Sequence, residues 1–246
     1  MHSSEPVVLL HAFPLDARMW DGLRPALGDA VITPDLPGFG TAPPAAAPDL
    51  DEAASAVLAT LDGLGVERAV VGGCSMGGYV AMALLRRAPA RVAGLILVNT
   101  KASADTDAAR EKRYATAAKA EAEGIGGLAD DMLTTLLGTT TIATRPAVEA
   151  RLRALIGEQS PAAVAWAQRA MAARPDSFAA LRGADVPALV LRGAEDALIP
   201  GEEADAMVAA LPHADYVEVA GAGHLAPLEL PDEVAATVAG WLADRR

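Results

Sequence analysis

Short apolar runs alternate along the chain with longer stretches that have a helical pattern of apolar positions. Most of the short runs are nearly continuous in Val, Ile, Leu and Ala, which is typical of strands covered on both faces by helices. This alternation predicts a mostly parallel sheet whose strands are joined by crossover helices. The six predicted strands are Val7–Leu10, Val31–Thr33, Ala69–Gly72, Leu95–Val98, Ala188–Leu191 and Tyr216–Val219.

Five helices are predicted around these strands. Asp49 precedes the second of them and is a suitable N-cap, and Pro231 suits the first turn of the last. The five ranges are Met19–Leu27, Leu50–Leu64, Gly77–Arg87, Glu202–Leu211 and Pro231–Ala243.

The stretch from Thr100 to Arg182 contains several helical patterns in succession and no strand-like run. One of its helices starts at Pro161, with Ser160 as the N-cap. We therefore expect a helical cap over residues 100–182, inserted into an α/β core of residues 1–99 and 183–246. The length of 246 residues suits one such domain with an insertion.

Composition and charge exclude several classes of protein. With 52% hydrophobic and 21% charged residues, the chain can form a globular core. Its net charge of −12 argues against a nucleic-acid or acidic-membrane partner, because phosphate binding needs basic surface. The first apolar run ends at Leu10 and follows no basic residue, so it is too short for a signal peptide or a membrane span. We expect a cytoplasmic protein.

The predicted cap differs in charge from the rest of the chain. It contains eleven Lys and Arg against ten Asp and Glu, a net charge of +1, which leaves −13 for the remainder. Helices commonly carry solvated charge pairs, and this accounts for the balance. A cap that attracts an anionic substrate is the alternative.

The strongest chemical signal is the run Gly73-Cys74-Ser75-Met76-Gly77, which fits the pattern G-x-S-x-G between a predicted strand and a predicted helix. A serine at such a sharp turn is held in strained backbone geometry with its hydroxyl exposed. Glycines flank it because strand and helix approach closely there. We therefore predict that Ser75 is a nucleophile.

A serine hydroxyl needs a base within hydrogen-bond reach, and the base needs an orienting acid. Of the four histidines, His224 lies in a glycine-rich loop after the last predicted strand, where open parallel sheets gather their active sites. His2 is near the terminus, His213 lies in a polar turn, and His11 belongs to the loop after the first strand. His224 is the predicted base.

Asp196 is the predicted acid, because it follows the fifth strand and gives the chain order Ser, Asp, His. Glu195 is its local competitor. Asp35 lies in a turn-rich segment and is expected to bond backbone amides there. Asp185 precedes a strand and therefore lies at the wrong end of the sheet.

The oxyanion of a tetrahedral intermediate needs two backbone N–H donors. The residue after the nucleophile, Met76, is one predicted donor, and it also begins a helix whose N-terminus favours negative charge. The loop after the first strand reads His11-Ala12-Phe13-Pro14, and Phe13 is the second predicted donor.

Together these segments, with Asp35-Leu36-Pro37-Gly38-Phe39-Gly40, resemble the α/β-hydrolase superfamily, and within it the small esterases and lactonases grouped near 3-oxoadipate enol-lactonase. The run from Ala172 to Ser177 is similar to that group too. The resemblance spans the core and leaves the cap poorly matched. It implies an α/β-hydrolase fold with a Ser-His-Asp triad.

Two departures from the family pattern affect the expected structure. Ala12 stands where relatives commonly have glycine, which should narrow the oxyanion loop slightly. The first strand corresponds to the third in many relatives, so we expect the antiparallel N-terminal hairpin to be reduced or absent. An exposed sheet edge near Val31–Thr33 follows, and formation of a homodimer is one way to cover it.

The expected function is hydrolysis of a small-molecule ester, lactone or thioester through an acyl-enzyme on Ser75. The single cysteine, Cys74, is expected to be a small buried side chain of the core. One cysteine excludes an intramolecular disulfide and a multi-cysteine metal site. No metal or organic cofactor is implied. The alternatives are perhydrolysis or carbon–carbon cleavage on the same triad, and a ligand-binding signalling protein with slow turnover. Residues expected to line the substrate pocket are Met132, Leu136, Leu137, Trp166 and Met171.

Overall fold

A single six-stranded parallel sheet forms the centre of the molecule in the computed structural model, which describes residues 5–28 and 31–245. The strands lie in the order β2-β1-β3-β4-β5-β6, and each pairs in parallel with its neighbours. Their bounds are β1 Val7–Leu10, β2 Val31–Ile32, β3 Ala69–Cys74, β4 Val92–Val98, β5 Ala188–Gly193 and β6 Ala214–Val219. The predicted α/β sheet is confirmed, and β2 is an edge strand as expected.

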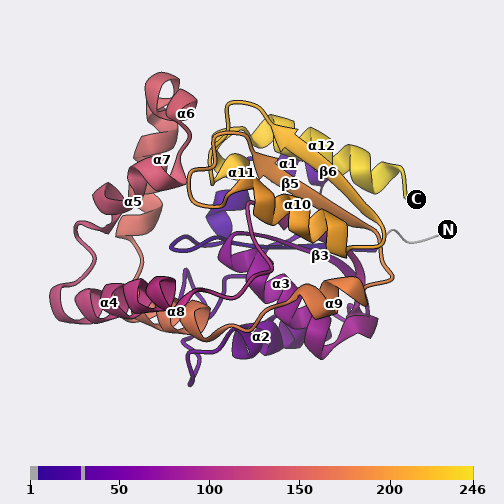
Figure 1. The fold of residues 1–246 in the computed structure, drawn as a ribbon, viewed down its shortest axis with the longest axis horizontal. Coiled ribbons are helices and arrows are strands. Elements are labelled where there is room, and N and C mark those ends of the chain that lie inside the picture. The colour runs from indigo at the N-terminus through magenta and orange to yellow at the C-terminus, as the bar shows by residue number, and fades with distance from the viewer. Residues whose placement is uncertain (1–4, 29–30, 246) are drawn as a thin grey trace.

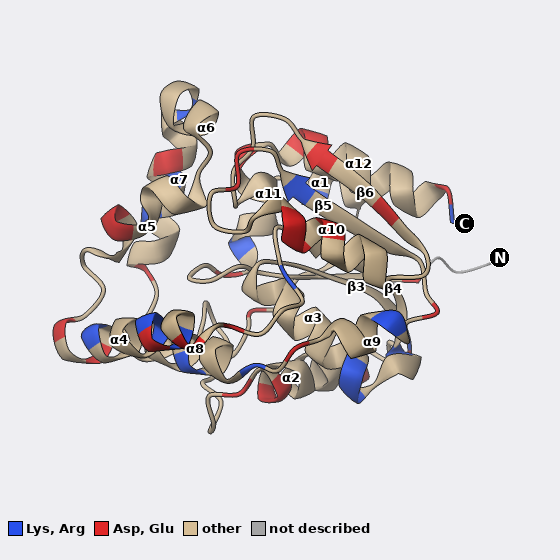
Figure 2. Ribbon diagram, viewed as in Figure 1, with Lys and Arg blue, Asp and Glu red and all other residues tan. Residues whose placement is uncertain are grey.

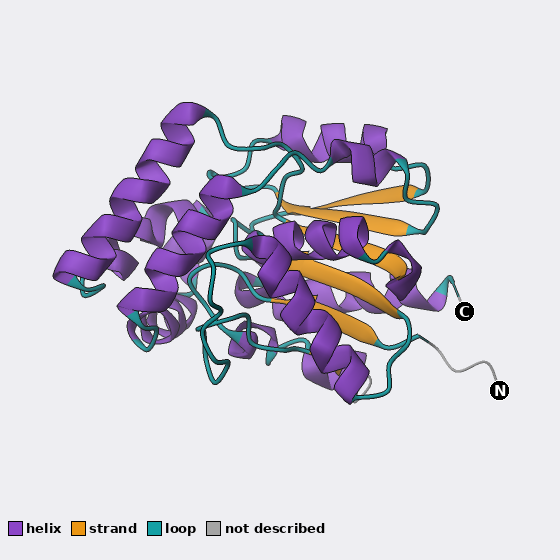
Figure 3. Cartoon of the chain, turned by 90° about the horizontal axis from the view of Figure 1, so that it is seen from below, coloured by secondary structure: helices purple, strands orange, loops and turns teal. Residues whose placement is uncertain are grey.

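Helices cover both faces of this sheet (Figure 3). On one face lie α2 (Leu50–Gly63), α3 (Met76–Arg87), α9 (Phe178–Arg182) and α10 (Gly201–Ala210). On the other lie α1 (Arg24–Leu27), α11 (Ala226–Glu229) and α12 (Pro231–Ala243). Successive residues of β1 alternate between the two cores: Val8 packs on the first face and Leu9 on the second.

The predicted helix Met19–Leu27 is wrong, because the structure divides this segment. A 3₁₀ helix, η1, covers Ala17–Trp20 and is capped by Asp16, and α1 begins only at Arg24. Pro25 explains the break, since proline has no N–H for an intrahelical bond and is tolerated only in a first turn.

Between β4 and β5 the chain forms helices and, within its described residues, no strand. Figure 1 shows α4 and α8 lying side by side at the carboxyl end of the sheet, with α5, α6 and α7 beside them. Ser160 caps α8 through the amide of Ala163, as expected. These helices are α4 Asp107–Glu123, α5 Leu128–Leu136, α6 Thr139–Thr144, α7 Pro146–Gly157 and α8 Pro161–Ala173, followed by α9.

Charge is distributed unevenly over these layers. Acidic and basic residues are interspersed along α4, whereas α10 carries Glu202, Glu203 and Asp205 and no basic residue (Figure 2). None of the helices described here combines the length and apolar character that crossing a membrane requires.

Candidate active site

Ser75 occupies the sharp turn between β3 and α3, with φ 51° and ψ −113°. A non-glycine residue with positive φ is strained by about 1–3 kcal/mol and is retained where the surroundings fix it. The Ser75 amide donates to the carbonyl of Val98 in β4, and its carbonyl accepts from Thr100 Oγ1 at 2.8 Å. Both bonds fix the turn at the carboxyl end of the sheet.

Two glycines allow this turn to form. A Cβ on Gly73 would lie 2.2 Å from the carbonyl carbon of Gly77, and a Cβ on Gly77 would lie 2.1 Å from the Leu10 carbonyl oxygen. Both separations are far below van der Waals contact. The expected close approach of strand and helix around Ser75 is therefore present.

His224 and Asp196 are hydrogen-bonded to each other in the loops that follow β6 and β5. His224 Nδ1 donates to Asp196, with distances of 2.9 Å to Oδ2 and 3.1 Å to Oδ1, and both side chains are fully buried. Burial opposes ionisation of Asp196, but hydrogen bonds from His224 and Asn99 lower the pKa of this carboxyl below its ordinary value. Asp196 is therefore an anion at neutral pH.

The other ring nitrogen of His224 is free. Nε2 is buried and has no hydrogen-bond partner among residues 5–28 and 31–245. Because the carboxylate of Asp196 can only accept, the proton of a neutral His224 lies on Nδ1 and Nε2 presents a lone pair. A buried nitrogen in this state can accept a proton.

The loop after β1 holds the Phe13 amide near this turn. His11 Nε2 accepts from the Leu36 amide at 2.8 Å, its Nδ1 donates to the Ala12 carbonyl, and burial lowers the pKa of its imidazole, which keeps the ring neutral. The Ala12 amide is engaged with Met19 Sδ at 3.1 Å. In the described part of the chain, the Phe13 amide has no hydrogen-bond acceptor, and Met76 contributes a first-turn amide of α3.

A cavity of about 330 Å³ adjoins Ser75. Of the five residues predicted to line it, Met132, Leu136 and Met171 do so. Leu137 and Trp166 do not. Leu137 is the C-cap of α5 and packs in the apolar core on the face of the sheet that α12 covers. The Trp166 indole donates to the Ala47 carbonyl at 2.7 Å and lines a separate surface hollow.

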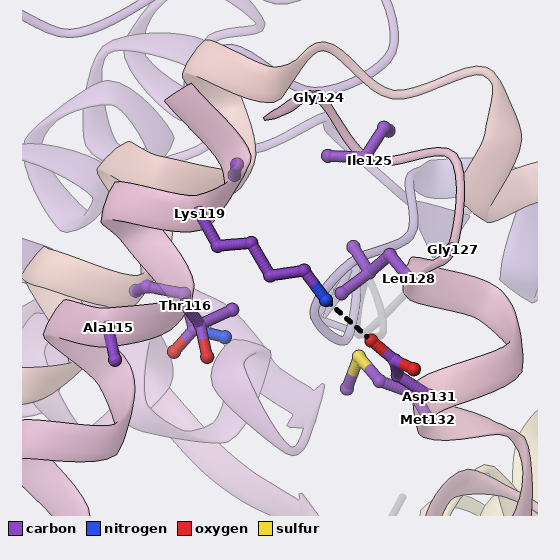
Figure 4. A pocket seen from close by; sticks show the side chains of 11 residues that line it. Ala115, Thr116, Lys119, Gly124, Ile125, Gly127, Leu128, Asp131 and Met132 are labelled. Atoms are coloured by element: carbon purple, nitrogen blue, oxygen red, sulfur yellow. Dashed lines mark hydrogen bonds and ion pairs between the residues drawn. The ribbon is translucent and has the colours of Figure 1, made fainter. Parts of the chain in front are cut away.

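A second cavity, of about 400 Å³, lies between α4 and α5 and shares Thr116, Met132 and Gln168 with the first. Figure 4 shows its wall, where Lys119 and Asp131 form an ion pair at 3.2 Å. The two cavities therefore share part of their walls.

The competing acids have other partners. Glu195 accepts hydrogen bonds from Thr139 and Thr140. Asp35 accepts from the amides of Ala17 and Thr41, as expected for a turn residue.

His213 lies apart from this pair, whereas the Cys74 thiol donates to the backbone carbonyl of His224 at 3.6 Å. His213 is exposed and contacts Asp185, as expected of a residue in a polar turn, and His2 is outside the described residues. Cys74 is buried as predicted, and burial raises the pKa of its thiol well above the ordinary value. Groups of three or more His, Cys, Asp or Glu side chains able to hold a metal ion do not occur in residues 5–28 and 31–245.

Comparison with known proteins identifies the family of the chain. A model of the alpha/beta hydrolase family matches residues 7–237. The chain is an alpha/beta hydrolase. It is 34% identical over 244 residues to a pimeloyl-[acyl-carrier protein] methyl ester esterase of Aromatoleum aromaticum, covering 94% of this chain and 96% of that protein.

Solved structures place this alpha/beta hydrolase among esterases and lactonases. A thermophilic esterase from Thermogutta terrifontis, solved with malate bound, has a TM-score of 0.95 and 39% identity, over 98% of this chain and 90% of that one. The enol-lactonase from Burkholderia xenovorans LB400 has a TM-score of 0.87 and 28% identity, over 98% and 93% of the two chains. The hydrolase is thus of the esterase and lactonase type.

Three residues of the alpha/beta hydrolase site escaped the sequence analysis. Asn99 Nδ2 donates to Asp196 at 2.8 Å and to the Gly223 carbonyl, and Asn99 itself has φ 45°. Thr100 bonds the Ser75 carbonyl. Glu229, which is buried, accepts from the amides of Gly138, Gly223 and Leu225. Asn99 and Thr100 directly follow a buried strand, and this position could have marked them as site residues in the sequence. The sequence around Glu229 contains no comparable signal.

Proposed function

We propose that this alpha/beta hydrolase cleaves a carboxylic ester or lactone of a small molecule through an acyl-enzyme on Ser75. The proposal is supported by the buried His224–Asp196 pair, in which Nε2 of His224 is unpartnered among the described residues, and by a cavity lined by Ser75, whose φ is positive. These are the parts that activation of a serine hydroxyl requires.

The proposed reaction proceeds in two halves. Ser75 Oγ attacks the carbonyl carbon while His224 Nε2 takes the hydroxyl proton, and Asp196 stabilises the imidazolium that forms. The N–H groups of Phe13 and Met76 donate to the oxyanion. The C–O bond to the alcohol then breaks, and the alcohol leaves with the proton from His224. Water attacks the acyl-enzyme in the same way, and the products are acid and alcohol, joined in one molecule when the substrate is a lactone.

Relatives of the chain support ester and lactone chemistry rather than one substrate. The relatives named above are a methyl ester esterase, a thermophilic esterase and an enol-lactonase. All three names describe cleavage of an acyl–oxygen bond, which suits a serine nucleophile.

Labelling with a fluorophosphonate followed by intact-mass spectrometry tests this proposal. We expect one adduct on the wild type, none on Ser75→Ala and strongly slowed labelling of His224→Ala. Turnover of a model ester should fall about 10⁴-fold in either variant, because the triad acts as a unit.

Matched variants separate loss of the nucleophile from loss of the fold. Ser55→Ala alters a serine on α2 whose hydroxyl donates to the Asp51 carbonyl, and His213→Ala removes an exposed imidazole. Both should label like the wild type. If the folded wild type takes up no adduct, the proposed hydrolase function is wrong and the ligand-binding alternative replaces it.

A further inference from the structure

The cavity beside Ser75 has a cationic wall, although the chain as a whole carries a net charge of −12. Lys101, Lys112 and Arg113 line it, and Asp105 is the one carboxylate among its lining residues. The wall is close to the nucleophile in the fold, because Lys101 follows directly after Thr100, whose hydroxyl bonds the Ser75 carbonyl.

Asp105 neutralises only part of this charge. It is nearly fully buried and contacts Arg113 at 2.5 Å, Arg174 at 2.8 Å and Lys101 at 3.5 Å. Burial opposes its ionisation, but the two guanidinium groups hold the pKa of the carboxyl well below its usual range. Three cations therefore surround one anion.

Each of the two arginines in this cluster has a further partner besides Asp105. Arg113 also donates to Gln168, and Arg174 lies 4.0 Å from the centre of the Tyr79 ring. Glu203, which accepts from Ser103, adds a second negative charge in the neighbourhood of Arg174. With Glu203 included, Lys101, Arg113 and Arg174 still exceed the acids by one charge, and Lys112 adds another.

Lys112 has no ion-pair partner within the described parts of the chain. Lys119 provides the contrast, because it lies seven residues further along α4 and is paired with Asp131 in the second cavity (Figure 4). Seven residues are two helical turns, so both lysines lie on the same side of α4. The charge of Lys119 in the second cavity is therefore neutralised by an ion pair. The charge of Lys112 in the cavity beside Ser75 is not.

We propose that the substrate of this hydrolase bears a carboxylate some carbons away from the ester, and that Lys112 and Lys101 bind it. This inference rests on the proposed function of Ser75 and names the substrate class of the same site. The carboxylate supplies the negative charge that the cavity wall lacks, while Met132, Leu136 and Met171 contact the apolar part of the substrate.

Two pairs of esters test the proposal by pH-stat kinetics. Monomethyl adipate and methyl hexanoate differ only at the far end of the acyl group, and 6-acetoxyhexanoate and hexyl acetate differ only at the far end of the alcohol. We expect kcat/KM to favour the carboxylate in at least one pair, and Lys112→Gln to reduce that preference about fivefold, the size of a partly exposed ion pair.

Lys119→Gln is the matched control, because it makes the same change about 10 Å along the same helix, around one Debye length away. It should leave the preference unchanged within about twofold. The inference is overturned if both neutral esters are preferred by the wild type, or if Lys112→Gln and Lys119→Gln have equal effects.

Calorimetric titration of Ser75→Ala with adipate tests the same inference without turnover. Adipate should bind more tightly than 1,6-hexanediol, and adding Lys112→Gln should weaken adipate binding about fivefold. Failure of fluorophosphonate labelling would reject the proposed function alone, whereas equal binding of adipate and the diol would reject the carboxylate site.

Discussion

At the scale of single residues, the loop that carries His224 is held by a carboxylate outside the proposed chemistry. Glu229 is 2% exposed, and its oxygens accept from Gly223 at 2.9 Å, Leu225 at 3.1 Å and Gly138 at 2.8 Å. The first two of these residues flank His224. Three amide donors satisfy a carboxylate that would otherwise be costly to bury.

Glu229→Gln should therefore lower both stability and turnover. A carboxamide has one accepting oxygen, and its NH₂ would face an amide donor, so at least one buried hydrogen bond is lost at a cost of about 1–3 kcal/mol. We expect the free energy of unfolding in urea to fall by that amount, and kcat to fall more than KM changes. Glu233→Gln, which alters an exposed residue of α12, is the control. Equal kcat in Glu229→Gln and the wild type would contradict the positioning role.

At the scale of elements, the contact between β1 and α3 depends on the absence of side chains. Gly77 in the first turn of α3 lies against the carbonyl of Leu10, the last residue of β1. The two elements carry the Phe13 loop and Ser75 respectively, so their separation sets the distance between the proposed oxyanion donors.

Gly77→Ala should disrupt this contact. A methyl group 2.1 Å from a backbone oxygen forces the strand and helix apart, and we expect a loss of about 1–3 kcal/mol, the usual range for overpacking. Gly240→Ala in α12 meets nothing within 4 Å and should instead stabilise the protein by about 0.5–1 kcal/mol. Thermal unfolding of both variants measures the difference, and similar shifts in the two would show that the close approach is unimportant.

The strands and the position of Ser75 could be predicted from the sequence because both are local signals. Val7–Leu10 is apolar throughout, and the glycines around Ser75 mark the turn. Side-chain orientation in the helices between β4 and β5 was not predictable. Trp166 and Met171 both lie on α8, and only packing against other elements decides that Met171 lines the cavity while Trp166 bonds Ala47. Pro25 was a readable signal for the break before α1.

At the scale of the whole molecule, acid should destabilise the fold through two buried carboxyls. The pKa values of Asp105 and Asp196 are both lowered in the native state from 3.8. In the unfolded chain these groups take up protons first as the pH falls, so the unfolded state binds more protons and stability decreases. The stability that these two carboxyls contribute is complete above their ordinary pKa. It is lost as the pH falls through their lowered pKa values in the native state.

The free energy of unfolding in urea should therefore be lower at about pH 3 than at about pH 6. Asp105→Asn removes one of the two groups, so its stability should depend less steeply on pH across this range. Asp107→Asn, whose side chain is exposed on α4, should keep the steepness of the wild type. If Asp105→Asn has the same pH dependence as the wild type, Asp105 does not contribute in this way.

The contacts made by Gly138 and its neighbours limit which segments can be exchanged between related hydrolases. Its amide bonds Glu229, the neighbouring carbonyl of Leu136 accepts from Leu225, and Thr140 bonds Glu195, next to Asp196. A chimera that took residues 100–182 from another hydrolase would thus remove contacts to both loops that hold the His224–Asp196 pair. Grafts that retain residues 136–140 of the recipient keep those contacts, and they allow α4, α7 and α8 to be varied without disturbing the His224–Asp196 pair.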